Sequence, residues 1–374
     1  MRKKFYRPTF AEIDLGAILY NLRQIRNRVD KDIKIMAIVK ADAYGHGMKE
    51  VSQAVARKGI DFFGVASLDE ARTLREAGIK KNIIVLGAIL PEEVEGVLRF
   101  NVIQTVSDLA IARLLSQLAQ SKKRIIKVHA KIDTGMGRLG VWHKDAVNFV
   151  KKLASLKNIK VDGIFTHFPS AEDDKVFTRN QLRDFKSLIE ELLRHGIDIP
   201  IKHTSNSMAV IDFKDSHMNM VRPGLIMYGL HPRSDLAKKL RLRPALRLKT
   251  KVVYVKPVSR GRSISYGRTY VTKKDTNIAT IPVGYGDGYS RDLSNRGHVL
   301  IKGRRLPIVG RVCMDMSMVD AGRSRTVKPG DDVVLIGKQG KDAVTVEEIA
   351  RLSNTIPYEV VCNIGRRVPR IYKY

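Results

Sequence analysis

The chain has 374 residues, a formal net charge of +30 and 44% hydrophobic residues. At about 100–200 residues per domain, this length predicts two domains, and a barrel of about 250 residues with a smaller partner fits equally well. No apolar run approaches the roughly 18 residues of a membrane span, and no apolar stretch follows the basic N-terminus as a secretory signal requires. We therefore expect a globular, cytoplasmic protein with no membrane association.

The excess of positive charge would favour anionic partners such as nucleic acid. No Asp or Glu occurs between Lys238 and Lys274. However, charged and apolar residues alternate from Leu240 to Val255, which is typical of a strand with one wet face. The chain has no zinc-finger spacing and no aromatic RNA-binding signature. We predict a basic, well-solvated surface and no specific nucleic-acid partner.

The first two-thirds of the chain alternate between short apolar runs and amphipathic helical segments. Asp14 is a predicted N-cap, and apolar residues then recur at helical spacing as far as Val29. The predicted strands are Ile35–Val39, Phe62–Ala66, Ile83–Leu86, Val102–Val106, Ile125–Ile132, Val161–Phe165 and Ile199–His203. The predicted helices between them include Met48–Arg57, Asp69–Ala77, Leu109–Leu118 and Gln181–His195.

This alternation requires a parallel sheet, either an open doubly wound sheet or a closed (β/α)8 barrel. Even strand spacing and the absence of a G-x-G-x-x-G run after the first strand favour the barrel. Polar residues follow several predicted strands: Lys40, Arg138, His167 and Ser207. In a barrel these strand ends converge on one rim, where active sites are built.

The pattern changes after about Pro232. Strand-like segments separated by Gly, Asp and Pro turns predict a mostly-β domain, with Val346–Leu352 as its only helix. The predicted strands are Leu248–Val255, Asn277–Val283, His298–Ile301, Leu306–Asp320 and Asp332–Ile336. The fold class is therefore α/β, with a (β/α)8 TIM-like barrel at 11–237 and a mostly-β domain formed by 1–10 and 238–374.

The chain has two cysteines, Cys313 and Cys362. They lie far apart in the sequence and show no metal-ligand spacing, so we predict neither a disulfide framework nor a metal site. Both are expected to be small buried hydrophobic residues.

Lys40 stands in the segment Val39–Gly47, directly after the first predicted barrel strand. Burial in a rim pocket would lower the pKa of its ammonium group, and a neutral amine can form a Schiff base with an aldehyde. The alternative, from this segment alone, is a surface lysine on a loop.

Three further segments carry candidate anion-binding groups. Ser207 lies between a strand end and a predicted helix, where hydroxyl and backbone N–H groups cradle phosphate. Gly224, two residues after Arg222, would let the backbone approach an anion closely. Arg138 follows a turn with two glycines and offers a planar fork of donors. Taken alone, Ser207 is better interpreted as an ordinary N-cap and Gly224 as a turn glycine.

Tyrosines and a methionine stand in the C-terminal part. Tyr266 could act as a base only in a positive environment, because the ordinary pKa of tyrosine is about 10. As isolated residues, Tyr285, Met314 and Tyr358 are interpreted as packed core side chains.

Together these segments closely resemble alanine racemase, a pyridoxal 5'-phosphate enzyme built from a barrel and a C-terminal β domain. The matching motifs stand in order along nearly the whole chain: AIVKADAYGHG, KIDTGMGRLG, HTSNS, VRPGLIMYG, SYGRTY, GYGDGY and CMD. The resemblance implies interconversion of L-alanine and D-alanine, and supply of D-alanine for peptidoglycan.

The resemblance also implies a role for each matching residue. Lys40 would hold the cofactor covalently and act as one base, and Tyr266 would be the second base on the opposite face of the substrate. The cofactor phosphate would be held by Tyr44, Ser207, Gly224, Leu225 and Tyr358. Arg222 would face the pyridine nitrogen, and His167 would hydrogen-bond to Arg222.

Substrate binding would fall to Arg138 and Met314, with Arg138 also contacting the cofactor's phenolic oxygen. Lys131 matches a lysine that is carbamylated in some family members, where it orients that arginine. Tyr266 and Met314 would come from the partner subunit, so the resemblance implies a homodimer with shared active sites.

Three other interpretations differ in class or reaction. Related amino-acid decarboxylases share the barrel and cofactor but typically place an acid where Arg222 stands. Small pyridoxal-phosphate-binding homeostasis proteins are single barrels without the β domain that supplies Tyr266. A nucleic-acid-binding protein would rest on charge alone. A broad-specificity or serine racemase remains open within the same chemistry, because one methylene is worth only about 1–3 kcal/mol of discrimination.

Overall fold

The computed structural model describes residues 6–323 and 326–374, so residues 1–5 of the expected N-terminal segment lie outside the described residues. The chain forms two compact units. The barrel unit comprises residues 19–43 and 48–242, and the β-rich unit comprises residues 1–18, 44–47 and 243–374.

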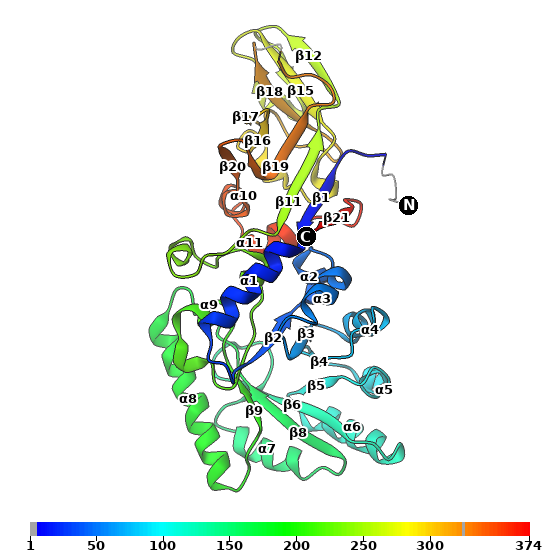
Figure 1. The fold of residues 1–374 in the computed structure, drawn as a ribbon, viewed down its shortest axis with the longest axis vertical. Coiled ribbons are helices and arrows are strands. Elements are labelled where there is room, and N and C mark those ends of the chain that lie inside the picture. The colour runs from blue at the N-terminus through cyan, green and yellow to red at the C-terminus, as the bar shows by residue number, and fades with distance from the viewer. Residues whose placement is uncertain (1–5, 324–325) are drawn as a thin grey trace. The chain divides into compact units, whose positions relative to one another are not determined.

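The barrel unit is built on eight parallel strands (Figure 1). Their order is β10 (Met220–Val221), β2 (Lys34–Ile38), β3 (Phe62–Val65), β4 (Asn82–Val85), β5 (Ile103–Val106), β6 (Ile126–Asp133), β8 (Ile159–Phe165) and β9 (Ile201–His203). A short strand, β7 (Val141–Trp142), pairs with β6. Backbone hydrogen bonds from Asn219 N to Lys202 O (3.3 Å) and from Arg222 N to Ser205 O (3.0 Å) bring the β9 side to the β10 side. The predicted barrel is therefore confirmed.

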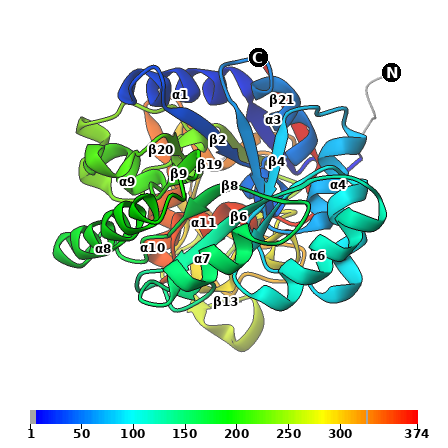
Figure 2. The ribbon, with the colours of Figure 1, turned by 90° about the horizontal axis from the view of Figure 1, so that it is seen from below.

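Helices follow the strands and cover them on the outside, as α4, α6, α7 and α8 show in Figure 2. The helices are α1 (Leu15–Arg28), α3 (Met48–Val55), α4 (Leu68–Glu76), α5 (Val94–Arg99), α6 (Leu109–Ser121), α7 (Ala146–Ala154), α8 (Lys175–Arg194) and α9 (Ser207–Asp212). Several of their starts are capped by side chains, as when Asp14 Oδ1 accepts from Ala17 N at 2.7 Å. Four of the 3-10 turns are η1 (Pro91–Glu93), η2 (Lys214–Ser216), η3 (Leu225–Tyr228) and η4 (Ser234–Lys238).

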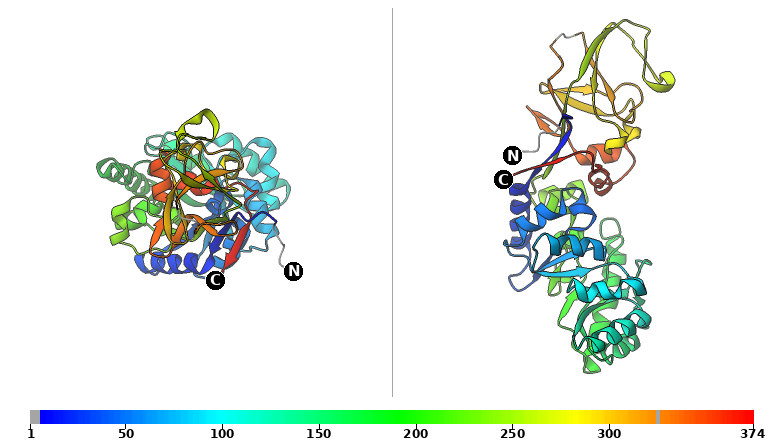
Figure 3. Two further views of the ribbon diagram at one scale, coloured as in Figure 1. Left: turned by 90° about the horizontal axis from the view of Figure 1, so that it is seen from above. Right: turned by 90° about the vertical axis from the view of Figure 1, so that its right-hand side faces the viewer.

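The β-rich unit contains a seven-stranded sheet (Figure 1). Its order is β17 (Arg304–Pro307), β16 (His298–Ile301), β19 (Asp332–Gln339), β11 (Leu246–Lys251), β1 (Phe10–Asp14) and β21 (Arg370–Lys373), with β20 (Asp342–Val344) paired to β19. A second sheet orders β12 (Tyr254–Val258), β15 (Thr276–Ile281) and β18 (Ser317–Gly322), as Figure 3 shows in yellow and orange. β13 (Ser263–Ile264) and β14 (Tyr270–Val271) form a small hairpin.

The structure corrects three predicted elements of this unit. The single strand expected at Leu248–Val255 is divided between β11 and β12, because the chain passes at residues 252–253 from one sheet to the other. The strand expected at Leu306–Asp320 is β17 and β18 with a loop between them. Gly310 turns this loop with φ +73°, in contact with the backbone of Ile264.

The third correction concerns the helices. Val346–Leu352 is confirmed as α10, but a second helix, α11 (Pro357–Cys362), follows it. Pro357 at the first helical turn was its sequence signal. Within the described residues, no helix is long and apolar enough to cross a membrane.

Candidate active site

Lys40 stands just after a strand, as expected, and begins a separate turn. Strand β2 ends at Ile38, and α2 (Lys40–Tyr44) follows it with φ angles of 52–54° from Ala41 to Tyr44. These left-handed angles cost roughly 1–2 kcal/mol for each non-glycine residue. Strained backbone of this kind concentrates at functional sites, where neighbouring structure holds it in place.

Side chains from the barrel hold the Lys40 turn in its strained form. The Glu70 carboxylate accepts from Ala41 N at 2.7 Å and from Ala66 N at 2.6 Å, so it joins the turn to the end of β3. Asp42 Oδ1 accepts from Met48 N at 2.7 Å at the start of α3. Lys40 itself is half-buried.

Arg222 lies just beyond β10 and is 4% exposed. Its guanidinium donates to four neutral acceptors: His203 Nδ1 (3.0 Å), Thr166 O (2.9 Å), Thr204 O (2.8 Å) and His167 Nδ1 (3.3 Å). Burial lowers the pKa of Arg222 to about 9, which still leaves it positively charged at neutral pH. Across residues 6–323 and 326–374, no carboxylate forms a hydrogen bond or ion pair with this guanidinium.

Two histidines extend the Arg222 contacts into the barrel. Arginine can only donate, so His203 Nδ1 accepts and His203 Nε2 carries the hydrogen. That hydrogen is donated to His129 Nδ1, 2.9 Å away. Burial holds the pKa of His203 well below its ordinary value and lowers that of His129 to about 3, with Arg222 adding to both shifts. Both rings therefore stay neutral.

Packing fixes the two rings. Phe165 stacks on His203 with centroids 4.5 Å apart and planes 8° from parallel. A Cβ at Gly163 would lie 2.4–2.5 Å from the His129 ring, so glycine leaves the space that this ring fills.

The loop after β6 carries Arg138. Asp133 organises this loop, because its carboxylate accepts from the backbone N–H groups of Gly135, Met136 and Gly137 at 2.8–2.9 Å. Arg138 at the end of the turn is exposed.

Lys131 lies on β6 itself and is 4% exposed. Its Nζ donates to Ile132 O at 2.7 Å and lies 5.5 Å from the Phe165 ring centroid. Burial and then the charge of Arg222 lower the pKa of Lys131 to about 8. A substantial fraction of this amine is therefore neutral near pH 8.

His167 marks the centre of a cationic cluster. Its pKa is held well below the ordinary value, first by burial and then by four positive groups: Arg222, Arg138, Lys131 and Lys40. The structure therefore brings these predicted site residues of the barrel close to one another. Four cationic side chains near a neutral imidazole make a positively charged region, the cationic cluster, that would favour an anionic ligand.

The rim also holds Ser207 and Gly224. Ser207 begins α9, and its Oγ accepts from Gly224 N at 2.9 Å. Leu225 begins the turn η3, so two helical N-termini are joined through one hydroxyl. All three residues are buried.

The other predicted site residues belong to the β-rich unit. Tyr44 is 8% exposed, and its ring lies 5.9 Å from that of Tyr358 on α11. Gly45 permits this packing: with φ +76°, a Cβ there would lie 2.2 Å from Val361 O. Arg370 fastens the same segment by donating from Nε to Gly45 O at 3.0 Å.

Tyr266 and Met314 are exposed on the β-rich unit, at 70% and 53%. Tyr266 stands on the turn η5 (Tyr266–Arg268), where Ser265 and Arg268 have φ of 66° and 50°. The alternative interpretation of Met314 and Tyr285 as packed core residues is wrong, since Tyr285 is 44% exposed.

The cysteine prediction also needs correction: Cys313 is half-buried and Cys362 is exposed. Neither lies in a group of three or more possible metal ligands among the residues that the structure describes.

The sequence reasoning missed two residues of the site, His129 and His203. The signal was the period of two in β6, which places His129 on the same side of the strand as Lys131. His203 lies on β9, which pairs with β8 and places His203 opposite Phe165. This pairing joins distant segments of the chain, so no local sequence pattern predicts it.

The fold is that of a (β/α)8 barrel protein with an additional β-rich unit, and cationic side chains gather around His167 in the barrel unit. Two family models cover the chain: the alanine racemase N-terminal domain matches residues 13–232, and the alanine racemase C-terminal domain matches residues 245–372. The chain therefore belongs to the alanine racemase family of enzymes.

Individual relatives agree with this assignment. The alanine racemase of Halothermothrix orenii is 49% identical over 374 residues, which cover 100% of this chain and 99% of the relative. The solved alanine racemase structure of Clostridium difficile 630 has a TM-score of 0.93 at 41% identity and covers 99% of this chain and 97% of that chain. A Bacillus anthracis alanine racemase structure with bound L-Ala-P has a TM-score of 0.93 at 38% identity, covering 99% and 96%.

Proposed function

We propose that the chain binds pyridoxal 5'-phosphate and interconverts L-alanine and D-alanine with two bases, Lys40 and Tyr266. The observation that carries the proposal is the cationic cluster around His167, where every acceptor that Arg222 meets among the described residues is neutral. The family membership supports the reaction, and the charge pattern supports the cofactor.

The donor set fits this cofactor. Its phosphate suits the buried pair of helical N-termini joined by Ser207 and Gly224. Its phenolic oxygen and the substrate carboxylate suit Arg138 and the neighbouring cations. Its pyridine nitrogen suits Arg222. Tyr44 and Tyr358, with their rings 5.9 Å apart, are the proposed further phosphate ligands from the β-rich unit.

When bound, this cofactor acts as an electron sink that makes the substrate Cα proton removable. Racemisation requires that a proton leave one face of the Cα and arrive at the other. In our proposal, Lys40 Nζ holds or delivers the proton on one face, and the Tyr266 hydroxyl does so on the other.

Arg222 tunes the electron sink. A carboxylate beside the pyridine nitrogen would favour its protonated form, whereas a charged arginine donates to the nitrogen and disfavours protonation. An unprotonated nitrogen would make the bound cofactor a weaker electron sink, so Arg222 would disfavour transamination.

We propose a homodimer in which Tyr266 and Met314 enter the partner's active site. Both side chains are large, apolar in part and exposed on the β-rich unit, and Tyr266 is held on a strained turn. Segments 1–10 and 238–374 would be the domain that completes the partner's site, and 11–237 the cofactor-binding barrel.

Two further proposals concern the setting of the enzyme. Lys131 is a candidate for carbamylation, because its lowered pKa leaves neutral amine to react with carbon dioxide. The enzyme would supply D-alanine for peptidoglycan in the cytoplasm, without a specific nucleic-acid or membrane partner.

Chiral analysis of the purified protein tests the proposed reaction. The protein, loaded with pyridoxal 5'-phosphate, is incubated separately with L-alanine, L-serine and several larger L-amino acids. Fast formation of D-alanine alone is the expected result. Comparable turnover of several amino acids would replace alanine specificity with broad specificity. No D-product, with cofactor visibly bound, would eliminate Tyr266 as a working base.

A further inference from the structure

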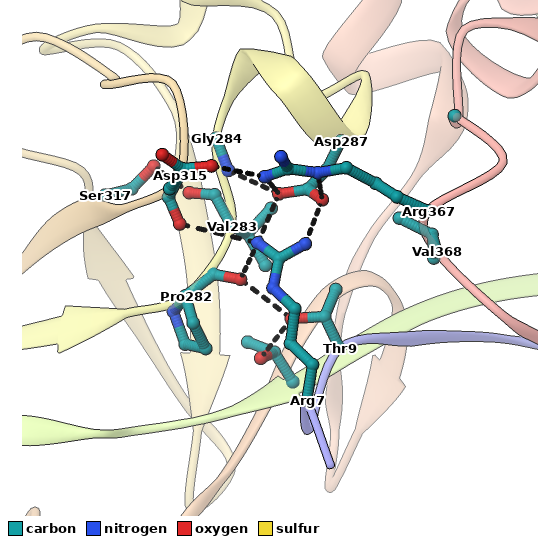
Figure 4. A network of polar contacts seen from close by, with 12 residues as sticks. Arg7, Thr9, Pro282, Val283, Gly284, Asp287, Asp315, Ser317, Arg367 and Val368 are labelled. Atoms are coloured by element: carbon teal, nitrogen blue, oxygen red, sulfur yellow. Dashed lines mark hydrogen bonds and ion pairs between the residues drawn. The ribbon is translucent and has the colours of Figure 1, made fainter. Parts of the chain in front are cut away.

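A buried carboxylate, Asp287, stands at the centre of a charged network in the β-rich unit (Figure 4). Its side chain is 0% exposed. Arg7 from the N-terminal segment and Arg367 from near the C-terminus both pair with it. Arg7 Nη2 lies 2.7 Å from Asp287 Oδ2, Arg367 Nε lies 2.7 Å from Oδ1, and Gly284 N donates to Oδ2 at 3.0 Å.

The same network joins two loops, 282–288 and 313–317. Tyr285 N donates to Cys313 O and Gly286 N donates to Met314 O, both at 3.0 Å. Arg367 Nη2 also reaches Asp315 Oδ1 at 2.7 Å, so one arginine contacts a carboxylate on each loop. Figure 4 shows the Arg367 guanidinium joined to both carboxylates.

Glycines make the contact between the loops very close. A Cβ at Gly284 would lie 2.1 Å from Cys313 O. At Gly286, a Cβ would lie 3.1 Å from Met314 O. The loop that carries Tyr285 therefore lies flat against the loop that carries Met314, and a shift of one displaces the other.

The negative charge of Asp287 holds the two arginines of this network together, so the network would rearrange without it. Burial alone would raise the pKa of its carboxyl, but hydrogen bonds from Arg7 and Arg367 outweigh burial and lower it. Without this carboxylate, two guanidinium groups would face each other in a chain of net charge +30. Removing the buried carboxylate would leave two partly exposed guanidinium groups without their shared partner, which favours a rearrangement of the network.

We propose that Asp287 is a positioning residue for substrate binding. Its carboxylate holds the loops of Tyr285 and Met314 in the one arrangement that fits the active site of the partner subunit. The inference rests on the proposed shared active site, and it assigns the GYGDGY segment a role in presenting residues across the dimer.

The first test is Asp287→Asn, which preserves size but replaces the acceptor charge with a neutral amide. We expect KM for alanine to rise about tenfold with a smaller change in kcat, since a misplacement of about 1 Å at a binding group can cost one to two orders of magnitude. Cofactor content, read from the absorbance of the bound group, should stay at the wild-type level. An unchanged KM in a folded, cofactor-loaded variant would overturn the proposal.

A matched control separates positioning from general stability. Glu12, on β1 of the same unit, is 7% exposed and pairs with Arg247, Lys249 and Lys373. Glu12→Gln removes a comparable buried carboxylate that contacts neither loop, so it should lower the melting temperature and leave KM unchanged. An equal rise in KM in this control would show that Asp287 acts only through stability.

A milder variant covers the case in which Asp287→Asn does not fold. Arg367 is 41% exposed at its side chain, so Arg367→Gln is tolerable while removing the contacts to Asp287 and Asp315. It should raise KM by a smaller factor. No change in KM would count against the network.

Mixed dimers distinguish failure of this inference from failure of the shared site. Lys40→Ala abolishes the barrel site of its own subunit. In a dimer of a wild-type subunit with a Lys40→Ala, Asp287→Asn subunit, the one working site is completed by altered loops, and KM should be raised. In a dimer of Lys40→Ala with Asp287→Asn, the working site is completed by intact loops, and KM should be normal.

The reverse pattern would place the effect of Asp287 within its own subunit and so refute the shared site, while the loop-positioning role of Asp287 would stand. KM could also be normal in both mixed dimers but raised in the Asp287→Asn homodimer. That result would refute the proposal that Asp287 holds the loops for the active site of the partner subunit.

Discussion

Arg222 retains its positive charge among acceptors that carry none. Two imidazoles and two carbonyls accept its hydrogen bonds, and no anion among the described residues pairs with the guanidinium. A neutral His203 completes this arrangement, because its tautomer is fixed by donation to His129. The charge of Arg222 is therefore not neutralised by an anion. A ring nitrogen bound beside it would be disfavoured from taking up a proton.

Arg222→Glu tests this argument. A carboxylate here would raise the pKa of the pyridine nitrogen, and an increase of one in that pKa raises the ratio of protonated to neutral nitrogen about tenfold. We therefore expect pyridoxamine phosphate to accumulate during turnover with L-alanine while the racemisation rate falls. The measurement is chromatography of the cofactor released after a fixed number of turnovers.

Arg222→Lys is the control, because it keeps the positive charge in the same place. It should lose some racemase activity without forming pyridoxamine phosphate. If the Arg222→Glu variant forms no more pyridoxamine phosphate than Arg222→Lys does, the proposed role of this charge is wrong.

The sequence could reveal those site residues whose signal lies in the neighbouring sequence. Lys40, Arg138, His167 and Ser207 each follow a strand, so their meeting at the barrel rim was predictable from the alternation alone. The contact of His203 with His129 was not, because it depends on strands that are 74 residues apart and on a space left by a glycine.

Among the elements, the turn α2 shows how far local propensity can be overridden. Alanine and aspartate favour right-handed helix or turn, yet Ala41 and Asp42 have φ of 52° and 53°. Glu70 and the start of α3 hold the backbone in this form through three hydrogen bonds to the turn and its neighbours. No pattern in the segment predicts this, because the constraint comes from helices later in the chain.

Ala41→Gly measures the strain in the turn. Ala41 is exposed, so glycine removes the left-handed penalty of roughly 1–2 kcal/mol while adding unfolded-state entropy of about 0.5–1 kcal/mol. We expect a net gain of about 0.5–1 kcal/mol, seen as a rise of about 1–3 °C in the melting temperature.

The matched control is Ala110→Gly at the exposed start of α6, where the same replacement should lower the melting temperature. Equal destabilisation by both replacements would mean that the turn is relaxed when the protein is in solution.

The β-rich unit marks the limit of prediction from element patterns. Its strands were recognised by composition, but two were merged with their neighbours because apolar residues continue across the breaks. Val252 is 1% exposed at the point where the chain changes sheets, and Ile308 is 1% exposed just past the end of β17. Buried loop residues look like strand residues until their hydrogen-bond partners are known.

At the scale of the whole molecule, acidic residues are shared among several cations. Glu12 pairs with three basic side chains, and Asp212 pairs with Lys175, Arg233 and Lys239. With 68 basic and 38 acidic residues, side chains alone leave 30 basic groups without a carboxylate of their own. The ion pairs therefore relieve only part of the repulsion among positive charges.

Salt should stabilise this protein. Added ions screen repulsion between exposed like charges, and the Debye length falls from roughly 20–30 Å at low salt to below 10 Å at physiological ionic strength. We expect the melting temperature to rise by several degrees between about 20 mM and about 500 mM potassium chloride. A fall would show that the ion pairs outweigh the repulsion.

The same titration shows whether the charge serves catalysis. Alanine, the proposed substrate, is a zwitterion without net charge near neutral pH, so the field of the protein cannot steer it as it steers an anion. We therefore expect kcat/KM for alanine to change less than about twofold over the range in which the melting temperature rises. A steep decline of kcat/KM with salt, at unchanged cofactor content, would instead mean that the positive surface assists substrate capture. The net positive charge would then contribute to catalysis and not only to the solvation of the surface.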